Sequence, residues 1–185
     1  GKSSLMRALT GDHVLVADKL FATLDTTVRA MHPETFPRIL VSDTVGFIQK
    51  LPHDLVASFR STLDEAGDAS LLLYVVDASD PAFRAQLEVT RTVLGEIDAG
   101  DVPSILILNK VDCLDIVQIS LLVREFPDAL RISTRNEADI ARVKQIVRER
   151  LTPTMEVSEM LVPYDDKSGM LGEIRINKIE ILEIE

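Results

Sequence analysis

Hydrophobic residues gather in three short runs along the chain, and each run ends in a polar turn. They read RILVSDTVG from Arg38, SLLLYVVDASD from Ser70 and PSILILNKVD from Pro103. Runs of this length that are rich in Ile, Leu and Val, without alternating polar residues, are typical of strands buried on both faces of a parallel sheet. The pattern therefore predicts three such strands.

Segments with helical spacing lie between and after these runs. Residues 52–69 and 81–100 place apolar side chains three or four positions apart, and Gly100 is expected to end the second helix. A short strand at 129–133 and a helix at 137–151 follow. Strand and helix thus alternate, which predicts a doubly wound α/β sheet that binds its ligand at the carboxyl ends of the strands.

The pattern changes after residue 151. Pro153 breaks the helix, and residues 153–185 predict a small C-terminal α+β element, either a hairpin or a strand followed by a helix. Its Ile-rich end, RINKIEILEIE, fits an amphipathic helix or an edge strand, and the spacing of its apolar residues does not distinguish the two. We therefore expect a main domain over residues 1–152 and part of a small domain over 153–185.

Composition narrows the class of protein. The chain has 185 residues, of which 46% are hydrophobic, and can bury one sizeable core. Its formal net charge of -10 argues against broad attraction to nucleic acid or membranes, so we expect no membrane partner and no sequence-specific DNA binding. No run approaches the ~18 apolar residues of a membrane span. A single cysteine, Cys113, excludes an internal disulfide and fits a cytoplasmic location.

The chain opens on Gly1, Lys2, Ser3 and Ser4, followed by the apolar stretch LMRAL. This order fits the end of a phosphate-binding loop and the start of its helix. In such a loop, backbone amides and Lys2 would hold phosphates, and the hydroxyl of Ser3 would ligate Mg²⁺. An ordinary helix start capped by serine explains these residues alone about equally well.

A second candidate lies at the end of the first hydrophobic run, in LVSDTVGF. Asp43 leaves the end of a predicted strand, and Gly46 follows three positions later. The carboxylate can hold the water shell of Mg²⁺, while a glycine lets a backbone amide approach a γ-phosphate. A plain strand-to-loop turn explains the same two residues equally well.

The third candidate, LILNKVD, is the most specific. Asn109, Lys110 and Asp112 directly follow a buried strand, so their side chains are expected at the carboxyl edge, beside a base. The carboxylate of Asp112 can accept from N1–H and the N2 amino group of guanine, a pair of donors that adenine lacks. A chance surface turn is the disfavoured alternative. Ser133 and Thr134, after the last predicted strand, are weaker candidates for backbone contacts with the base.

With these three motifs in order, the chain resembles a translation-factor-class P-loop GTPase. Four stretches, VADKLFATLDTTVRA, SDTVGFIQKLPHDLVASFRSTLDEA, LLLYVVDASDP and PSILILNKVD, are similar to the HflX-type GTPases of the Obg and HflX superfamily. The resemblance covers about residues 1–152. It implies a GTPase domain, hydrolysis of GTP, Mg²⁺ as cofactor with GTP or GDP as ligand, and association with the large ribosomal subunit.

The resemblance also assigns roles to single residues. Thr23 is the expected switch threonine that closes on Mg²⁺ and the γ-phosphate. Lys2, Thr23, Asp43 and Gly46 are therefore expected to support catalysis. The metal is expected to be held by Ser3, Thr23 and Asp43.

Phe47 follows the glycine at a position where many GTPases carry a glutamine that orients the attacking water. A phenylalanine side chain has no donor or acceptor. Another residue, the backbone or a partner must then orient the water, and intrinsic turnover is expected to be slow. Anchoring of the loop in an apolar pocket is a compatible role.

The resemblance further implies an N-terminal domain, and a strand and a glycine of the phosphate-binding loop, upstream of Gly1. The expected fold is thus a G domain that lacks its first strand. That strand would lie in the middle of the sheet, so its neighbours would lose ladder hydrogen bonds. A chain of this kind is expected to fold poorly or to bind nucleotide weakly by itself.

Three interpretations of function remain open. The first is a switch that binds and hydrolyses GTP on the ribosome. The second is a GTP-gated ribosome-binding module in which hydrolysis is only a slow reset. The third is an incomplete fragment that is inactive alone. An ATPase is the least favoured, because Asp112 would face an adenine that offers it no donors.

Overall fold

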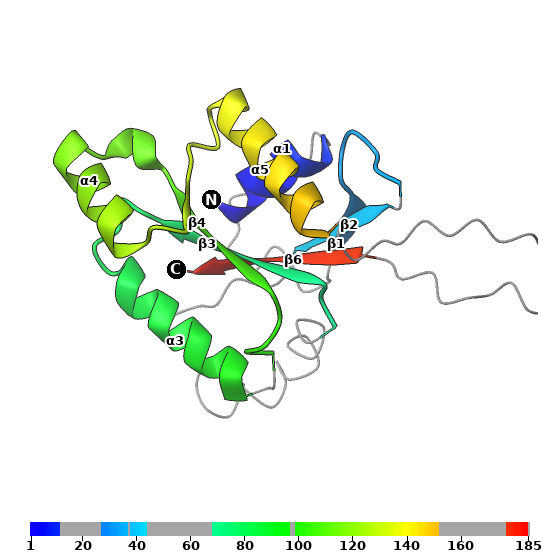
Figure 1. Cartoon of the computed structure of the whole chain (residues 1–185), viewed down its shortest axis with the longest axis horizontal. Helices are drawn as coiled ribbons and strands as arrows, with labels where there is room; N and C mark the ends of the chain where they lie inside the picture. Colours follow the sequence, from blue (N-terminus) through cyan, green and yellow to red (C-terminus); the bar gives the residue numbers. More distant parts are fainter. Residues whose placement is uncertain (12–26, 37, 44–67, 97–98, 152–176, 185) are drawn as a thin grey trace, which may run out of the picture.

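The computed structural model describes residues 1–11, 27–36, 38–43, 68–96, 99–151 and 177–184. Within these residues the strands form one sheet, in the order β1-β2-β6-β3-β4-β5 (Figure 1). β1 runs antiparallel to β2, and all other neighbours are parallel. The strands are β1 (Thr27–Ala30), β2 (Ile39–Asp43), β3 (Leu71–Asp77), β4 (Ser104–Asn109), β5 (Leu130–Arg131) and β6 (Asn177–Ile184).

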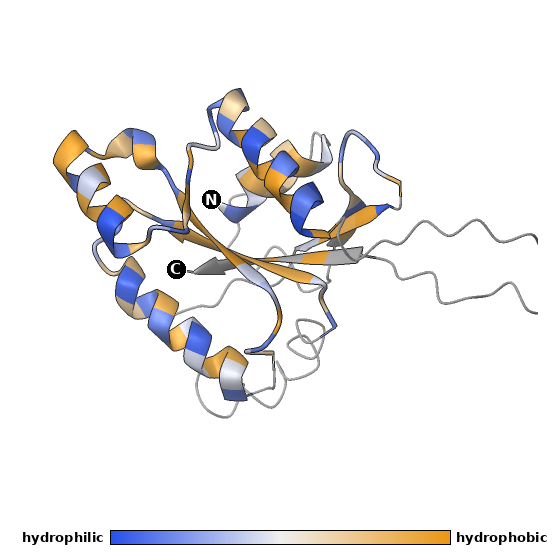
Figure 2. Ribbon diagram, in the orientation of Figure 1, coloured by the Kyte–Doolittle hydropathy of each residue, from blue (hydrophilic) through white to orange (hydrophobic). Residues whose placement is uncertain are grey.

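Helices cover both faces of this sheet (Figure 1). The helices are α1 (Lys2–Thr10), α3 (Phe83–Glu96), α4 (Ile116–Glu125) and α5 (Glu137–Leu151), with a short 3₁₀ helix η1 (Val111–Cys113). α1 and α5 share one core with Leu73 and Val75 of β3, whereas α3 shares the opposite core with Leu72 and Val76. Alternate residues of β3 thus enter different cores, so the strand is apolar almost throughout, as Figure 2 shows in orange.

The predicted doubly wound α/β architecture is confirmed. All three hydrophobic runs form strands, namely β2, β3 and β4, and the short strand expected near residue 130 is β5. The helices expected at 81–100 and 137–151 are α3 and α5. The helix expected at 52–69 lies almost wholly outside the described residues. The boundary expected between residues 152 and 153 stays a prediction.

The Ile-rich C-terminal segment corrects the expectation of a helix or an edge strand. β6 lies in the centre of the sheet, parallel to both neighbours, with Ile181 opposite Asp43 of β2 and opposite Leu73 of β3. Ile179 and Ile181 are fully buried among the residues of the α1 and α5 core. The expectation that strands in the middle of the sheet lack ladder partners is therefore wrong, because β6 pairs with both of them.

Helix α4 is not among the elements that the sequence pattern predicts. Six of its ten residues are Ile, Leu or Val, yet Leu122 alone is buried, so the apolar positions do not mark one face. Its start is fixed by a capping box, in which the Gln118 amide donates to Asp115 Oδ1 (2.8 Å) and the Asp115 amide to Gln118 Oε1 (2.9 Å).

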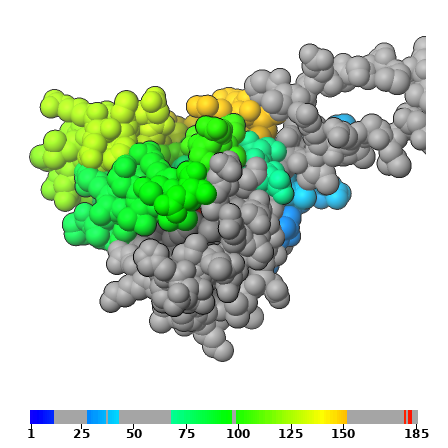
Figure 3. All heavy atoms as spheres, turned by 90° about the horizontal axis from the view of Figure 1, so that it is seen from below, coloured from blue at the N-terminus to red at the C-terminus, as the bar shows by residue number. Residues whose placement is uncertain are grey.

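α4 is held beside α3 by a bidentate ion pair. Nε and Nη2 of Arg84 each lie 2.6 Å from a carboxylate oxygen of Glu125. The ring of Phe83 also lies 5.9 Å from the ring of Phe126, centroid to centroid. Figure 3 shows the green atoms of α3 next to the yellow-green atoms of α4. This contact fixes the layer on the face of the sheet opposite α1 and α5.

Candidate functional site

The centre of the candidate base site is the side chain of Asn109, the last residue of β4. Asn109 is only 1% exposed. Its Oδ1 accepts the amide of Lys110 (2.8 Å) and the amide of Thr134 (3.2 Å). Its buried Nδ2 has no hydrogen-bond partner in the part of the chain that the structure describes. A buried donor without an acceptor is costly, which marks this nitrogen as one that a bound ligand can satisfy.

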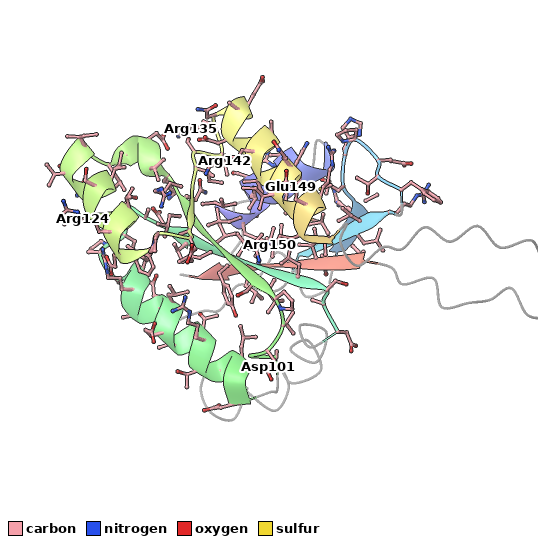
Figure 4. All side chains as sticks on the ribbon, viewed as in Figure 1. Asp101, Arg124, Arg135, Arg142, Glu149 and Arg150 are labelled. Carbon is pink, nitrogen blue, oxygen red and sulfur yellow. The ribbon has the colours of Figure 1, made fainter. Side chains whose placement is uncertain are left out.

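The turn after Asn109 brings Asp112 to the same edge. Lys110 adopts a left-handed backbone conformation, with φ 63° and ψ 32°, and the chain then enters η1. Asp112 lies in this single turn with its side chain 38% exposed, and Arg135 Nη1 approaches Asp112 Oδ2 to 3.7 Å. Figure 4 places Arg135 on the loop that leads into α5. The carboxylate of Asp112 is therefore accessible and close to a cation.

The loop after β5 completes this edge of the sheet. The Ser133 amide donates to Asp139 Oδ2 (2.8 Å), which fixes the loop against the first turn of α5. The Val111 amide donates to the Ile132 carbonyl (3.2 Å), so the two loops are also joined through their backbones. The structure thus brings together five predicted residues of the base site, which are Asn109, Lys110, Asp112, Ser133 and Thr134.

Asp77 is a member of this edge that sequence reasoning missed. It ends β3 opposite Asn109 of β4, and its Oδ2 forms an ion pair with Nζ of Lys110. Burial would raise the pKa of Asp77, but hydrogen bonds from Lys110 and Ser79 outweigh it and hold that pKa below its ordinary value of 3.8. The sequence did contain a sign of this role, because Asp77 directly ends a buried strand, as Asp43 does.

The phosphate end of the candidate site lies at the start of α1. Gly1 is the N-cap residue and offers no side-chain cap, while Ser3 and Ser4 lie exposed inside the first turn. The alternative of a helix start capped by serine is therefore wrong. Lys2, the first helical residue, is only 4% exposed. The amino end of a helix carries partial positive charge and favours anions.

The remaining predicted residues are only partly described. Asp43 ends β2 at the carboxyl edge of the parallel strands and pairs with Thr27 of β1. Thr23 and Gly46 lie outside the described residues, as does Phe47. Their expected roles in metal binding, switching and catalysis therefore stay predictions.

The described residues contain no group of three or more His, Cys, Asp or Glu side chains that could hold a metal ion. A Mg²⁺ ion bound by a serine hydroxyl, waters and phosphates needs no such group, so the oxygen donor of Ser3 suits it. No helix among these residues is long and apolar enough to cross a membrane.

Comparison with solved structures supports the fold. The crystal structure of a probable GTP-binding protein engB aligns with a TM-score of 0.54 and 21% sequence identity. The alignment covers 83% of this chain and 93% of that one. At this identity the likeness concerns the arrangement of helices and strands alone.

Comparison with curated sequences gives the family. The family described as 50S ribosome-binding GTPase matches residues 1–110. The GTPase HflX of Gluconacetobacter diazotrophicus is 59% identical over 174 residues, which are 94% of this chain and 38% of that protein. The GTPase HflX of Escherichia coli is 38% identical over 187 residues, covering 100% of this chain and 43% of that protein. This chain therefore belongs to the 50S ribosome-binding GTPase family and is of the HflX type.

Proposed function

We propose that this chain binds GTP, hydrolyses it to GDP and phosphate, and acts as a nucleotide-dependent switch. The observation that carries the proposal is the buried Nδ2 of Asn109, which has no hydrogen-bond partner among the described residues, in the same loop as the accessible carboxylate of Asp112. A purine N7 is an acceptor that suits Nδ2, and guanine presents N1–H and N2–H donors that suit the carboxylate. Adenine shares N7 but lacks those donors, so the pair selects GTP over ATP.

At the other end of the nucleotide, the first turn of α1 would receive the phosphates. The amides at this helix start and the ammonium of Lys2 supply positive charge. The hydroxyl of Ser3 would ligate Mg²⁺, with Thr23 and Asp43 completing its shell. Bound Mg²⁺ would neutralise charge on the β- and γ-phosphates.

Hydrolysis itself would be an in-line attack of water on the γ-phosphorus. Such catalysis rests on positioning and charge stabilisation rather than on covalent chemistry of the protein. Lys2 would stabilise the charge of the transferred group, and the amide of Gly46 would contact it. Because Phe47 cannot orient the water, intrinsic turnover should be slow until a partner supplies the missing group.

The proposed partner is the large ribosomal subunit, in the cytoplasm. The family description, 50S ribosome-binding GTPase, supports this partner. The chain itself spans about two fifths of the HflX relatives, 38% and 43% in the two cases above. GTP would order the segments around Thr23 and Gly46 and release them after hydrolysis. Phe47 favours a variant of this proposal, in which bound GTP gates ribosome binding and slow hydrolysis only resets the module.

The test is Mg²⁺-dependent binding of a fluorescent GTP analogue to this chain, followed by displacement. GTP and GDP should displace the analogue, and ATP at the same concentration should not. Displacement by ATP as effective as by GTP, or no binding at all, contradicts the proposal. Added 50S subunits should speed GTP hydrolysis, and if they bind in the presence of a non-hydrolysable analogue without speeding turnover, the gated module is the better description.

A further inference from the structure

The Asp77 carboxylate has a place in the base site that the proposed function does not use. One oxygen, Oδ2, pairs with Nζ of Lys110, and the other, Oδ1, accepts the amide (3.0 Å) and the hydroxyl (2.5 Å) of Ser79. The Ala78 amide also donates to the Asn109 carbonyl (2.9 Å). The end of β3 is therefore bonded to the start of the Asn109–Asp112 loop through both side chain and backbone.

That loop contains a strained residue. Lys110 has φ 63°, in the left-handed region that side chains other than glycine rarely adopt, and such a conformation persists only where its surroundings hold it. Asp77 supplies part of that restraint by fixing the far end of the lysine side chain. This conformation matters to the site, because the direction of the chain after Lys110 determines where Asp112 lies.

The pair is too exposed to serve mainly as a stabiliser of the fold. The side chains of Lys110 and Asp77 are 45% and 30% exposed, and ion pairs in contact with solvent contribute little to folding. A charge pair of this kind can still hold a flexible side chain in one place. Its effect should therefore be seen in what the loop binds rather than in how firmly the protein folds.

We propose that Asp77 is a positioning residue for base recognition: through Lys110 it holds the Asn109–Asp112 loop in the geometry that distinguishes guanine from related bases. This inference rests on the proposed function, because it concerns the same nucleotide site. It adds a residue outside the Asn-Lys-x-Asp motif to the determinants of specificity. The expected ligand class remains guanine nucleotides.

The test compares GTP with ITP, whose base lacks the N2 amino group and so offers Asp112 one donor fewer. The unmodified chain should bind GTP at least about 10-fold more tightly than ITP, the effect of one hydrogen bond to a charged acceptor. Asp77→Asn keeps the shape of the side chain and removes its charge. It should weaken GTP binding by about 5-fold and ITP binding less, so that the preference shrinks at least about 2-fold, as expected for residues in contact.

A double-mutant cycle shows whether Asp77 acts through Lys110. In a Lys110→Gln background, Asp77→Asn should change the Kd for GTP by less than about 2-fold, because the partner is already gone. An equal loss in both backgrounds would overturn the inference. The GTP-to-ITP ratio of each variant is measured beside its Kd. This ratio does not depend on the fraction of folded protein, so partial unfolding of Asp77→Asn cannot imitate the loss of preference.

Two control variants locate the effect. Ser79→Ala removes the hydroxyl on Oδ1 of Asp77 and leaves the ion pair, so the GTP-to-ITP ratio should be unchanged. Asp101→Asn makes the same chemical change just before β4, at the end of that strand opposite to Asn109, as Figure 4 shows. It should also leave the GTP-to-ITP ratio unchanged. If Asp77→Asn leaves the ratio unchanged while the parent chain prefers GTP, the inference fails and the proposed function stands. If the parent chain binds GTP no more tightly than ITP, the inference fails, whereas the proposed function fails only if GTP is not bound or is bound no better than ATP.

Discussion

The amide of Thr134 donates to Oδ1 of Asn109 over 3.2 Å, so one buried side chain ties the loop after β5 to the end of β4. The same oxygen also accepts the Lys110 amide. The two ends of the Asn109 amide therefore have different tasks. Oδ1 holds the two loops together. Nδ2 has no hydrogen-bond partner among the described residues, and we propose that it binds a ligand.

Replacing Asn109 with alanine should damage both folding and binding. Two backbone amides would lose their acceptor, which should lower the free energy of unfolding by about 1–3 kcal/mol, measured by urea denaturation. Binding of a fluorescent GTP analogue should also fall below detection. Asn136→Ala is the matched control, since Asn136 Oδ1 accepts the Ala138 amide (2.9 Å) at the start of α5. It should cost about 0.5–2 kcal/mol while binding persists, and equal binding by both variants would contradict this assignment.

The central position of β6 predicts a large effect of truncating one of its residues. Ile181 is fully buried, so Ile181→Ala should lower the free energy of unfolding by about 2–5 kcal/mol. Ile116→Ala provides the comparison, because Ile116 is 76% exposed on α4 and its truncation should change stability by no more than about 0.5 kcal/mol. Urea denaturation of both variants measures the difference. Similar small effects would show that β6 does not occupy the centre of the sheet.

The depressed pKa of Asp77 predicts a pH-dependent contribution to stability. In the unfolded chain an aspartate has a pKa of about 3.9, and in the folded protein the pKa is lower. The contribution is thus fully present above the unfolded value and is lost as pH falls through the folded value. The difference in unfolding free energy between the parent chain and Asp77→Asn should be at most about 1 kcal/mol at pH 7. It should shrink as pH falls below the unfolded value and vanish once the Asp77 carboxyl is protonated in the folded protein. A difference that is constant with pH would contradict the ion pair.

The elements that the sequence predicted are those in which burial imposes a clear pattern. β3 and β4 are covered on both faces, so their residues are apolar in continuous runs that end at Asp77 and Asn109. α5 buries one stripe and leaves the rest exposed, which gives its 3.6-residue period. The base-site residues could be predicted for the same reason, because they directly follow these strands.

The elements that were missed lack such a pattern. α4 is apolar on exposed as well as buried positions, and Figure 2 shows it largely orange. Its signal was the capping box formed by Asp115 and Gln118. β6 alternates Ile with charged residues over part of its length, which is typical of an edge strand. Its central place follows from pairing with β2 and β3, distant in sequence, which no local pattern encodes. Asp77 was missed because its partner, Lys110, is 33 residues away.

Whether Asp112 reads the base is measured most directly by the nucleotide preference of an Asp112→Asn variant. Xanthine carries a carbonyl oxygen where guanine carries the N2 amino group, so an asparagine amide at this position can donate to it, while the carboxylate of Asp112 cannot. Asp112→Asn should bind GTP about 10- to 100-fold more weakly than the parent chain and should bind XTP more tightly than GTP. Unchanged GTP affinity, with no gain for XTP, would show that Asp112 does not read the base.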